Sequence, residues 1–329
     1  MKLNAIRFVA ITLALIFVLP TLLSSCGYKA IPPSEEDLVV VGHVESFEVK
    51  MDELRFVTET YRKLLISRYG EGIFEGEERE TYLAMLKELV YSNITANYAV
   101  LILCSDVKIN LGEEAVLERV EERMAEIVSE MGGVSKYKQY LEENKLTDRL
   151  LRFNTEVDLL QNELLYVYVE DISLIENDDE KIYDIIMDEF ISVRHVFVSK
   201  KTDNAYEKIT RAYDALSNGR SFSYVMNDYN EDTDMTTDGL CIPRGYMIDS
   251  YDTVAFSLKA GQVSSIIECE QGYYIIERSA ISVLTVMQRF DYLKDLYQTY
   301  AFYDIIDNKQ ETLVFVPTEA GEQFISQPF

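Results

Sequence analysis

The stretch ISVRHVFVSK, residues 191–200, contains one of the two histidines of this 329-residue chain. Its apolar residues are typical of a β-strand, in which successive side chains point to opposite faces of a sheet. Val193, His195 and Phe197 therefore share one face, which we expect to be mostly buried. The spacing alone leaves open whether His195 is a working residue or a structural one.

The residues around this strand predict a small α+β unit. A helix precedes the strand, and two helices, an irregular loop over 231–247, a short helix and two further strands follow it. With so few strands the sheet must be small. The predicted helices cover 176–191, 204–219, 221–230 and 251–258, and the later strands cover 262–268 and 273–278.

Outside this unit the sequence is mainly helical. Apolar residues recur at helical spacing between the first strands and this unit and again over 283–307, and Thr147 is a predicted N-cap. One or two strands are expected over 38–50, where His43 would be a solvated strand residue. A last strand is expected over 312–317, and its pairing with the first would close the two ends of the chain into one domain.

The N-terminus resembles a bacterial lipoprotein signal. Two basic residues precede an apolar run over 8–23, which is shorter than the roughly 20 residues that a spanning helix needs. The sequence LSSC, ending at Cys26, follows directly. By this resemblance the signal peptide 1–25 is removed and the thiol of Cys26 carries a lipid.

Residues 26–37 would then tether the protein to the cell membrane, lipid-anchored on its extracytoplasmic face. The alternative is an uncleaved anchor with a chance cysteine. Both place the body of the protein outside the cytoplasm.

Composition and motifs exclude several classes of protein. The formal net charge of -26 and the pI near 4.4 disfavour binding to phosphate backbones, so no nucleic-acid partner is expected. Histidine is too scarce for a His-rich metal site, and CxxC, HExxH, GxGxxG, Walker and GxSxG motifs are absent. We therefore predict neither a metal nor a cofactor.

Three cysteines remain beyond Cys26. Cys104 falls in an apolar helical run and is predicted to be a buried small hydrophobe. Cys241 and Cys269 are either a disulfide or two free thiols, and the sequence leaves both open.

Six short motifs between residues 191 and 280 resemble the parvulin family of peptidyl-prolyl isomerases. They follow the family's order and spacing and cover the whole unit. The resemblance implies a domain over 188–281 with a four-stranded antiparallel sheet and surrounding helices. The motifs are RHVFV (194–198), LSNGRSF (216–222), YNED (229–232), RGYM (244–247), AFSLKAGQVSSII (255–267) and QGYYIIE (271–277).

The flanking helices resemble the helical chaperone domain of PrsA-type foldases and of the related periplasmic chaperone SurA. The stretch MGGVSKYKQYLEENKLTDRLLRFNTEVDLLQNELL, residues 131–165, carries this resemblance. In those proteins the helical domain is built from segments on both sides of the parvulin unit. The resemblance thus implies that 38–187 and 282–329 form one chaperone domain into which the parvulin domain is inserted.

The same resemblance implies a prolyl site with two parts. A polar network would consist of His195, Asp232 and Tyr274. An apolar cup for the proline ring would consist of Met247, Tyr251, Phe256 and Ile242.

This sequence departs from the family at several of these positions. Tyr274 replaces the family's second histidine, while Tyr251 and Ile242 each replace a phenylalanine. The turn TTDGL (236–240) replaces a Gly-Gly-Asp-Leu turn, and threonine resists backbone angles that glycine allows. A hydrogen bond between His195 and Tyr274 would be chemically reasonable, because tyrosine both donates and accepts.

These inferences predict an extracytoplasmic, membrane-anchored foldase that binds unfolded secreted proteins and isomerises X-Pro peptide bonds. The second hypothesis is a non-catalytic holdase in which the parvulin unit only binds peptides. Tyr274 and the two threonines favour the holdase, and His195, Asp232 and Met247 favour the enzyme. The client proteins and the oligomeric state, including a homodimer, stay open.

Overall fold

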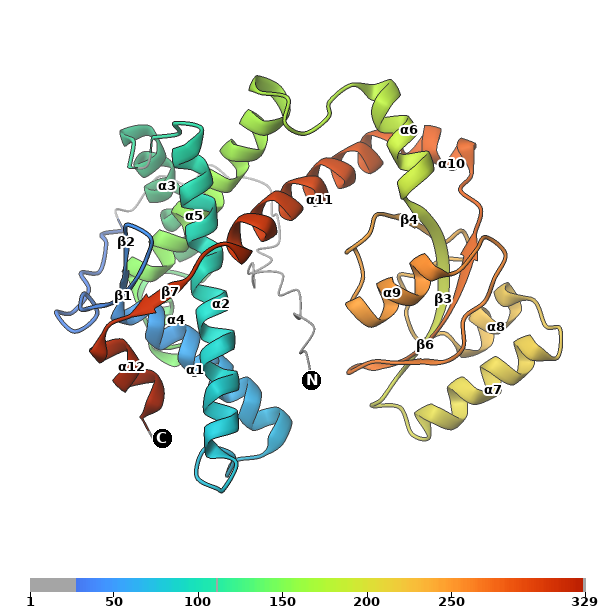
Figure 1. The fold of residues 1–329 in the computed structure, drawn as a ribbon, viewed down its shortest axis with the longest axis horizontal. Helices are drawn as coiled ribbons and strands as arrows, with labels where there is room; N and C mark the ends of the chain where they lie inside the picture. The colour runs from blue at the N-terminus through green and yellow to red at the C-terminus, as the bar shows by residue number, and fades with distance from the viewer. Residues whose placement is uncertain (1–27, 111, 328–329) are drawn as a thin grey trace. The chain divides into compact units, whose positions relative to one another are not determined.

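The computed structural model describes residues 28–110 and 112–327 (Figure 1). The predicted lipidation residue Cys26 lies outside the described residues. None of the helices in the described part has the length and apolar character needed to cross a membrane. The described chain forms two compact units: residues 169–302 make the first, and residues 28–168 together with 303–327 make the second.

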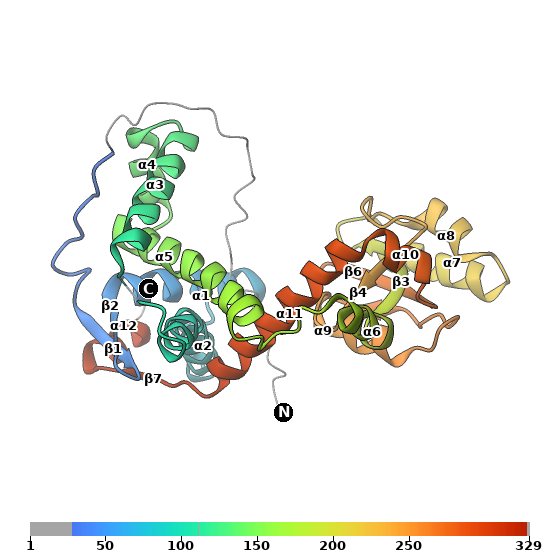
Figure 2. The same ribbon diagram turned by 90° about the horizontal axis from the view of Figure 1, so that it is seen from above.

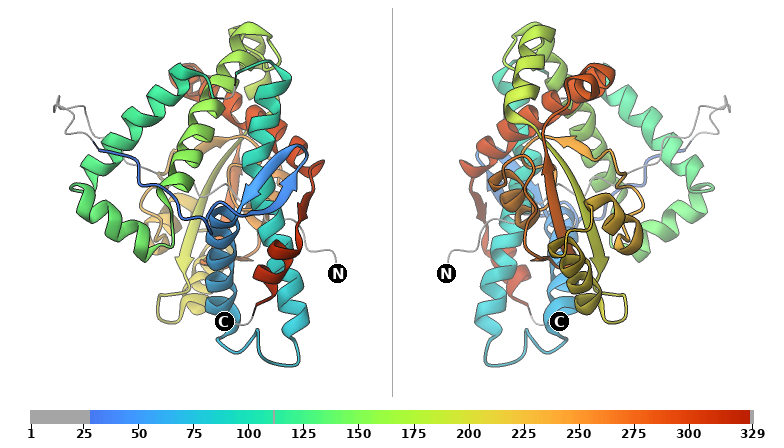
Figure 3. Two further views of the ribbon diagram at one scale, coloured as in Figure 1. Left: turned by 90° about the vertical axis from the view of Figure 1, so that its left-hand side faces the viewer. Right: turned by 90° about the vertical axis from the view of Figure 1, so that its right-hand side faces the viewer.

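The first unit is built around the four-stranded antiparallel sheet that was predicted, with strand order β4-β3-β6-β5. Its two long strands, yellow-green and orange, lie side by side in the right-hand view of Figure 3. The strands are β3 (Ile191–Ser199), β4 (Leu240–Ile242), β5 (Ile267–Glu268) and β6 (Gly272–Ser279). The helices are α6 (Asp179–Glu189), α7 (Ala205–Ser217), α8 (Phe222–Tyr229), α9 (Asp249–Ser257), α10 (Val283–Gln288) and the first part of α11 (Phe290–Glu311).

The prediction of an irregular loop over 231–247 is wrong in one place, because strand β4 lies within this range. Leu240 pairs with Val193 of β3, and Ile242 pairs with Ile191. Gly239, just before β4, has φ 75°, and a Cβ there would lie 2.5 Å from the carbonyl oxygen of Val193. Because the positive φ falls on Gly239 and not on Thr236 or Thr237, the departing turn still forms without strain at its threonines.

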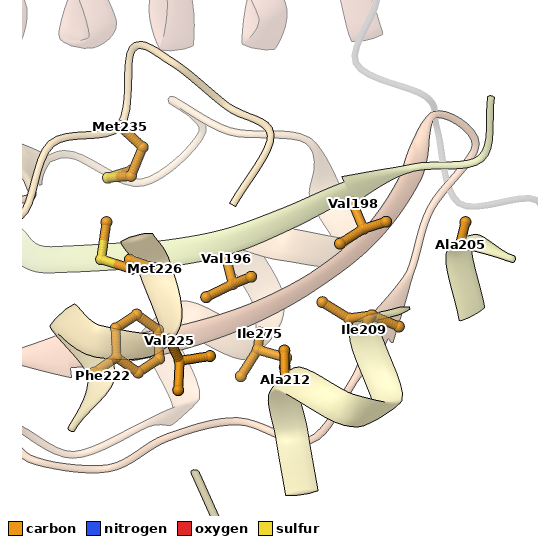
Figure 4. Packing of buried hydrophobic residues seen from close by; sticks show 10 residues of the cluster. All are labelled: Val196, Val198, Ala205, Ile209, Ala212, Phe222, Val225, Met226, Met235 and Ile275. Carbon is orange, nitrogen blue, oxygen red and sulfur yellow. The ribbon is translucent and has the colours of Figure 1, made fainter. Parts of the chain in front are cut away.

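An apolar core lies on each face of this sheet. Val196, Val198 and Ile275 pack against α7 and α8 in the cluster drawn in Figure 4. On the opposite face, Val193 and Ile276 belong to a cluster with residues of α9. His195 stands opposite Ile276 in the register and is buried on this second face, so the predicted burial of the histidine is confirmed.

The second unit is mainly helical and takes its segments from both sides of the first. Helix α11 gives its first part to one unit and its last part to the other, and Figure 2 shows it as one unbroken helix. A π-helical segment, η1 (Val167–Asp171), extends α5 at the other boundary between the units. The strands are β1 (Val40–Val44), β2 (Phe47–Lys50) and β7 (Phe315–Pro317), and the helices are α1 (Met51–Tyr69), α2 (Arg79–Asp106), α3 (Glu114–Glu130), α4 (Val134–Glu143), α5 (Asp148–Tyr166) and α12 (Glu319–Ser326).

The two ends of the chain pair in this second unit, as predicted. The red C-terminal strand lies against the blue N-terminal strands in Figure 1, in a sheet of order β2-β1-β7. His43 stands opposite Val316 and is exposed, which confirms it as a solvated strand residue. The hydroxyl of Thr147 accepts from the backbone of Leu150 and caps α5. Helix α12 was missed, and the single helix predicted over 283–307 is two helices separated at Arg289.

A cluster of buried polar side chains, which we call the interhelix network, joins α1, α2 and α5. The fully buried Asp52 accepts hydrogen bonds from Thr147 (2.6 Å) and from Nε of Arg149 (2.8 Å). Glu53 accepts from Arg149 (2.9 Å) and from the hydroxyl of Tyr98 (2.7 Å). Each carboxylate is thus paired with the guanidinium and with a hydroxyl, the arrangement that buried charges require.

Candidate active site

His195 lies near the middle of β3, and both nitrogens of its ring have a partner. Nε2 lies 2.9 Å from Oδ2 of Asp232, and Nδ1 lies 3.2 Å from the hydroxyl oxygen of Tyr251. The histidine is 1% exposed. The fold therefore brings together a residue of a central strand, a loop residue and a helix residue that are far apart in the sequence.

The chemistry of these partners determines the tautomer of His195. An ionised carboxylate only accepts hydrogen bonds, so the proton of the neutral ring lies on Nε2 and is donated to Asp232. Nδ1 then has a free lone pair and accepts the hydrogen bond of the Tyr251 hydroxyl. His195 is thus held from both sides in one orientation.

Burial keeps the His195 ring and the Tyr251 hydroxyl in their neutral forms. Desolvation lowers the pKa of the His195 imidazole below its ordinary value of 6.5, and the hydrogen bond and charge of Asp232 oppose that shift only in part. Desolvation, together with Tyr274 and Asp232, raises the pKa of the Tyr251 hydroxyl. At neutral pH the ring is uncharged, and the tyrosine keeps the proton that it donates.

Two residues that the sequence did not single out hold Asp232 in place. The side-chain oxygen of Asn230 accepts from the backbone N–H of Phe197 (2.8 Å), and its amide donates to the carbonyl of Asp232 (2.6 Å). Glu231 accepts from the backbone of Ser199 (2.7 Å) and pairs with Lys208 (2.8 Å). Strand β4 covers only the first residues of this edge of β3, so a polar loop can dock on the remainder, and this docking aims Asp232 at His195.

Tyr274 meets His195 through its ring. The two ring centroids are 5.0 Å apart with an interplanar angle of 85°, and Tyr274 makes a similar edge contact with Tyr251 at 5.3 Å. In the described chain, the hydroxyl that hydrogen-bonds to Nδ1 of His195 belongs to Tyr251 and not to Tyr274. Burial, with Cys269 and Asp232, raises the pKa of the half-buried Tyr274 hydroxyl to about 12.

The four residues predicted for the apolar cup lie together in the cluster on this face of the sheet. Met247 and Phe256 are half-buried, whereas Ile242 and Tyr251 are 1% and 0% exposed. The first two therefore offer accessible surface, and the last two lie beneath it.

Asp252, which no sequence motif indicated, holds the loop that carries Met247. The backbone N–H of Gly245 donates to Asp252 of α9 (2.9 Å), and the guanidinium of Arg244 also contacts this carboxylate. Arg244 lies over the ring of Phe256, 4.2 Å from its centroid. A signal for this role existed in the acidic first turn of α9, but a carboxylate at a helix start has many explanations.

A separate hollow of about 450 Å³ lies near α7 and α8. Its lining includes Arg194, Tyr213, Phe222 and Glu277 and none of the predicted site residues. We therefore locate the site by its side-chain geometry, since the chemistry of a network is more specific than the size of a hollow.

The three cysteines of the described chain are all buried and unpaired. Cys241 and Cys269 are buried free thiols, so of the two possibilities left open the disulfide is absent, and Cys104 is buried as predicted. Burial raises the pKa of Cys241 to about 11, which keeps it protonated. Among the described residues no group of three or more His, Cys, Asp or Glu side chains could hold a metal ion.

Comparison with known families agrees with this geometry. Residues 190–280 match the family described as rotamase, PPIC-type PPIase domain. This part of the chain is a PPIC-type PPIase domain. The match covers β3 to β6 and thus the whole network around His195, and it supports peptidyl-prolyl isomerase activity.

Similar proteins extend beyond the PPIC-type domain. The chain is 24% identical over 322 residues to a protein named Foldase protein PrsA from Caldanaerobacter subterraneus subsp. tengcongensis, covering 94% of each chain. It is 27% identical over 133 residues to Foldase protein PrsA of Geobacillus kaustophilus, covering 40% of this chain and 44% of that one. The crystal structure of foldase protein PrsA from Streptococcus pneumoniae matches with a TM-score of 0.35 and 16% identity, covering 89% of this chain and 99% of that chain.

Proposed function

We propose that this protein is a membrane-anchored foldase that isomerises X-Pro bonds in unfolded exported proteins. The observation that carries the proposal is the network of His195, Asp232 and Tyr251 beneath the accessible side chains of Met247 and Phe256, within a PPIC-type PPIase domain. A polar network under an apolar surface is what a prolyl isomerase needs and what a purely structural core does not.

The reaction needs no nucleophile and no metal. A peptide bond resists rotation with a barrier of about 18–20 kcal/mol because the nitrogen lone pair is delocalised into the carbonyl. Holding the proline ring on Met247 and Phe256 would exclude water from that carbonyl and so favour the twisted amide, in which the delocalisation is lost. Each 1.36 kcal/mol removed from the barrier accelerates the reaction tenfold.

The residues of the site have distinct parts in this proposal. The Asp232 side chain is 31% exposed, so it can face both His195 and a bound peptide. His195 is too deeply buried to reach a substrate proton, and both of its ring nitrogens are already hydrogen-bonded, so it would instead fix the direction of the Asp232 carboxylate. Tyr274 is half-buried, and its hydroxyl would be available to the bound peptide.

A protease-free isomerisation assay on a proline peptide tests the enzymatic part. We expect the chain from residue 27 onward to accelerate exchange, and we expect His195→Ala and Asp232→Ala to reduce the rate. A rate equal to the uncatalysed one with correctly folded protein would refute catalysis.

The second unit is proposed to be the chaperone domain, with the PPIase domain inserted over 188–281. The second unit is assembled from chain segments on both sides of the first, which supports an insertion. Exposed apolar side chains of its helices, such as Leu64 and Leu117, could contact unfolded chains. Suppression of client aggregation by a chain lacking 188–281 would support this assignment, and its loss together with retained folding would count against it.

The membrane anchor is proposed to be lipid on Cys26. The support is the sequence LSSC directly after an apolar run that is too short to span a bilayer. Labelled palmitate should enter the wild-type chain in cells and should not enter Cys26→Ser, which should also leave the membrane fraction. Equal labelling of both chains would refute the anchor.

The holdase remains the second candidate, and the replacement of the family's second histidine by Tyr274 favours it. It predicts aggregation suppression with no acceleration of isomerisation, whereas the foldase predicts both. The two assays on one preparation therefore separate the candidates.

A further inference from the structure

We propose that Tyr251 is a positioning residue: its hydroxyl orients His195 and replaces the hydrogen bond that the missing second histidine could have made. This refines the role of Tyr251, which the sequence placed in the apolar cup. The inference concerns the same site as the proposed function and rests on it.

The position of Tyr251 suits this role better than contact with a substrate. The residue is 0% exposed, and it lies in the first half of α9 with its ring at 5.6 Å and 80° from the ring of His195. Its hydroxyl oxygen is 3.2 Å from Nδ1 of His195. A side chain with no accessible surface cannot grip a proline ring, but it can hold its neighbour.

The buried Nδ1 atom needs such a partner. A buried acceptor without a hydrogen bond loses its solvation without compensation, which typically changes an equilibrium by tenfold or more. Tyr274, at the position of the family's second histidine, presents its ring to His195, and the hydrogen bond comes from α9 instead. Two tyrosines thus take the place of one histidine. Tyr274 occupies its position beside the ring of His195, and Tyr251 donates the hydrogen bond to Nδ1.

Holding Nδ1 has a consequence at the opposite nitrogen. As long as Tyr251 donates to Nδ1, the ring proton is confined to Nε2 and points at Asp232. If the hydroxyl were removed, Asp232 would still hold the proton on Nε2, but Nδ1 would lose its partner and the ring would be held from one side only, so the direction of the Asp232 carboxylate would be less well fixed. Tyr251 thereby acts on the exposed carboxylate through a residue that no substrate touches.

The decisive experiment is a double-mutant cycle with Tyr251→Phe and Tyr274→His in the chain from residue 27 onward. Tyr251→Phe keeps the ring and removes only the hydroxyl. We expect about a tenfold loss in kcat/KM for isomerisation. Adding Tyr274→His supplies a new ring nitrogen near His195 and should recover most of that loss. Tyr273→Phe, whose hydroxyl belongs to the opposite face of the sheet, is the matched control and should keep the wild-type rate.

Nitrogen NMR of the histidine ring provides a readout that does not depend on activity. Only two histidines are present, and the exposed His43 is an internal reference. We expect wild-type His195 to show a protonated Nε2 and a hydrogen-bonded, unprotonated Nδ1. In Tyr251→Phe the proton should stay on Nε2, and the Nδ1 signal should shift to that of an unprotonated nitrogen without a hydrogen bond. An Nδ1 signal that is the same with and without the hydroxyl, or a wild-type ring protonated on Nδ1, would overturn the inference.

The two readouts separate this inference from the proposed function. If the wild-type protein has no isomerase activity but Tyr251→Phe shifts the Nδ1 signal, the positioning role stands and the enzymatic function fails. If Tyr251→Phe does not fold, the wild-type tautomer still decides. A loss of activity in Tyr251→Phe that Tyr274→His does not recover, with an unchanged Nδ1 signal, would mean that the hydroxyl has another role and would also overturn the inference.

Discussion

Two polar networks of the described chain, the interhelix network in the second unit and the network around His195 in the first, differ in the number of charges that they enclose. The interhelix network encloses Asp52 and Glu53 and pairs both side chains with the one guanidinium of Arg149. The network around His195 is mostly neutral, and its single charge, on Asp232, lies at its partly exposed end. A network that serves stability closes around its charges, whereas a network that serves a site leaves its charge where a ligand can reach it.

The largest expected effect is a loss of stability when Arg149→Ala breaks the interhelix network. Two buried carboxylates would lose their counter-ion, which typically costs about 3–5 kcal/mol. Chemical denaturation should detect this loss. The isomerase activity of the molecules that remain folded should not change, because the site lies in the other unit.

Arg123→Ala is the control for this variant. Arg123 pairs with Glu126 on an exposed helix surface, where ion pairs contribute roughly 0–1 kcal/mol. Equal destabilisation by both variants would show that the interhelix network contributes no more to stability than an exposed ion pair.

A smaller loss of stability is expected from Gly239→Ala in the first unit, because the substitution would displace strand β3. The added Cβ would meet the carbonyl oxygen of Val193 at 2.5 Å in a backbone conformation that disfavours side chains. We expect a loss of about 1–3 kcal/mol, measured by thermal unfolding. Gly261→Ala has a similar φ but open space around it, so it should cost less; a cost equal to that of Gly239→Ala would contradict the contact argument.

The charge at the open end is tested by Asp232→Asn. The amide keeps the shape of the carboxylate but removes its charge, so we expect roughly a tenfold loss in kcat/KM, or about 1.4 kcal/mol. Stability should change little, because the side chain is partly exposed. A matched variant, Asp234→Asn in the same loop, should leave the rate unchanged.

The smallest effect is expected from pH. The folded-state pKa of His195 lies below its ordinary value of 6.5, so the unfolded chain binds the proton more readily than the folded one. The stability due to neutral His195 is therefore fully present above pH 6.5 and is lost as pH falls from there towards the folded pKa. In His195→Gln this part of the acid-induced loss should disappear, and an identical pH profile for both proteins would refute the assignment.

Much of the first unit could be predicted from its sequence because its signals are local. Alternation in β3 and helical spacing in α7 indicated the elements, and short motifs indicated their order. Strand β4 could not be predicted in the same way, because three residues have no period and are extended only through pairing with β3.

The site was predicted less completely than the fold. The family positions named residues that the structure brings together, but the direction of each hydrogen bond depends on side-chain geometry. The expected bond from His195 to Tyr274 is replaced by one to Tyr251, and no spacing rule could have chosen between two tyrosines that both lie near the ring. The loop residues Asn230 and Glu231 were missed because their partners are backbone groups of a distant strand.

The pairing of β1 with β7 has a consequence for the order in which the protein can form. His43 and Val316 are neighbours in the sheet, so a strand completed early in synthesis must wait for the last segment of the chain. The first unit, by contrast, is made of residues 169–302, and all its strands are complete before that segment emerges. During export from the N-terminus we therefore expect the PPIase unit to reach its native state first, so that it shortens the loop that the chain ends must close. A protein proposed to assist the folding of others would depend on one of its own domains to bring the second together.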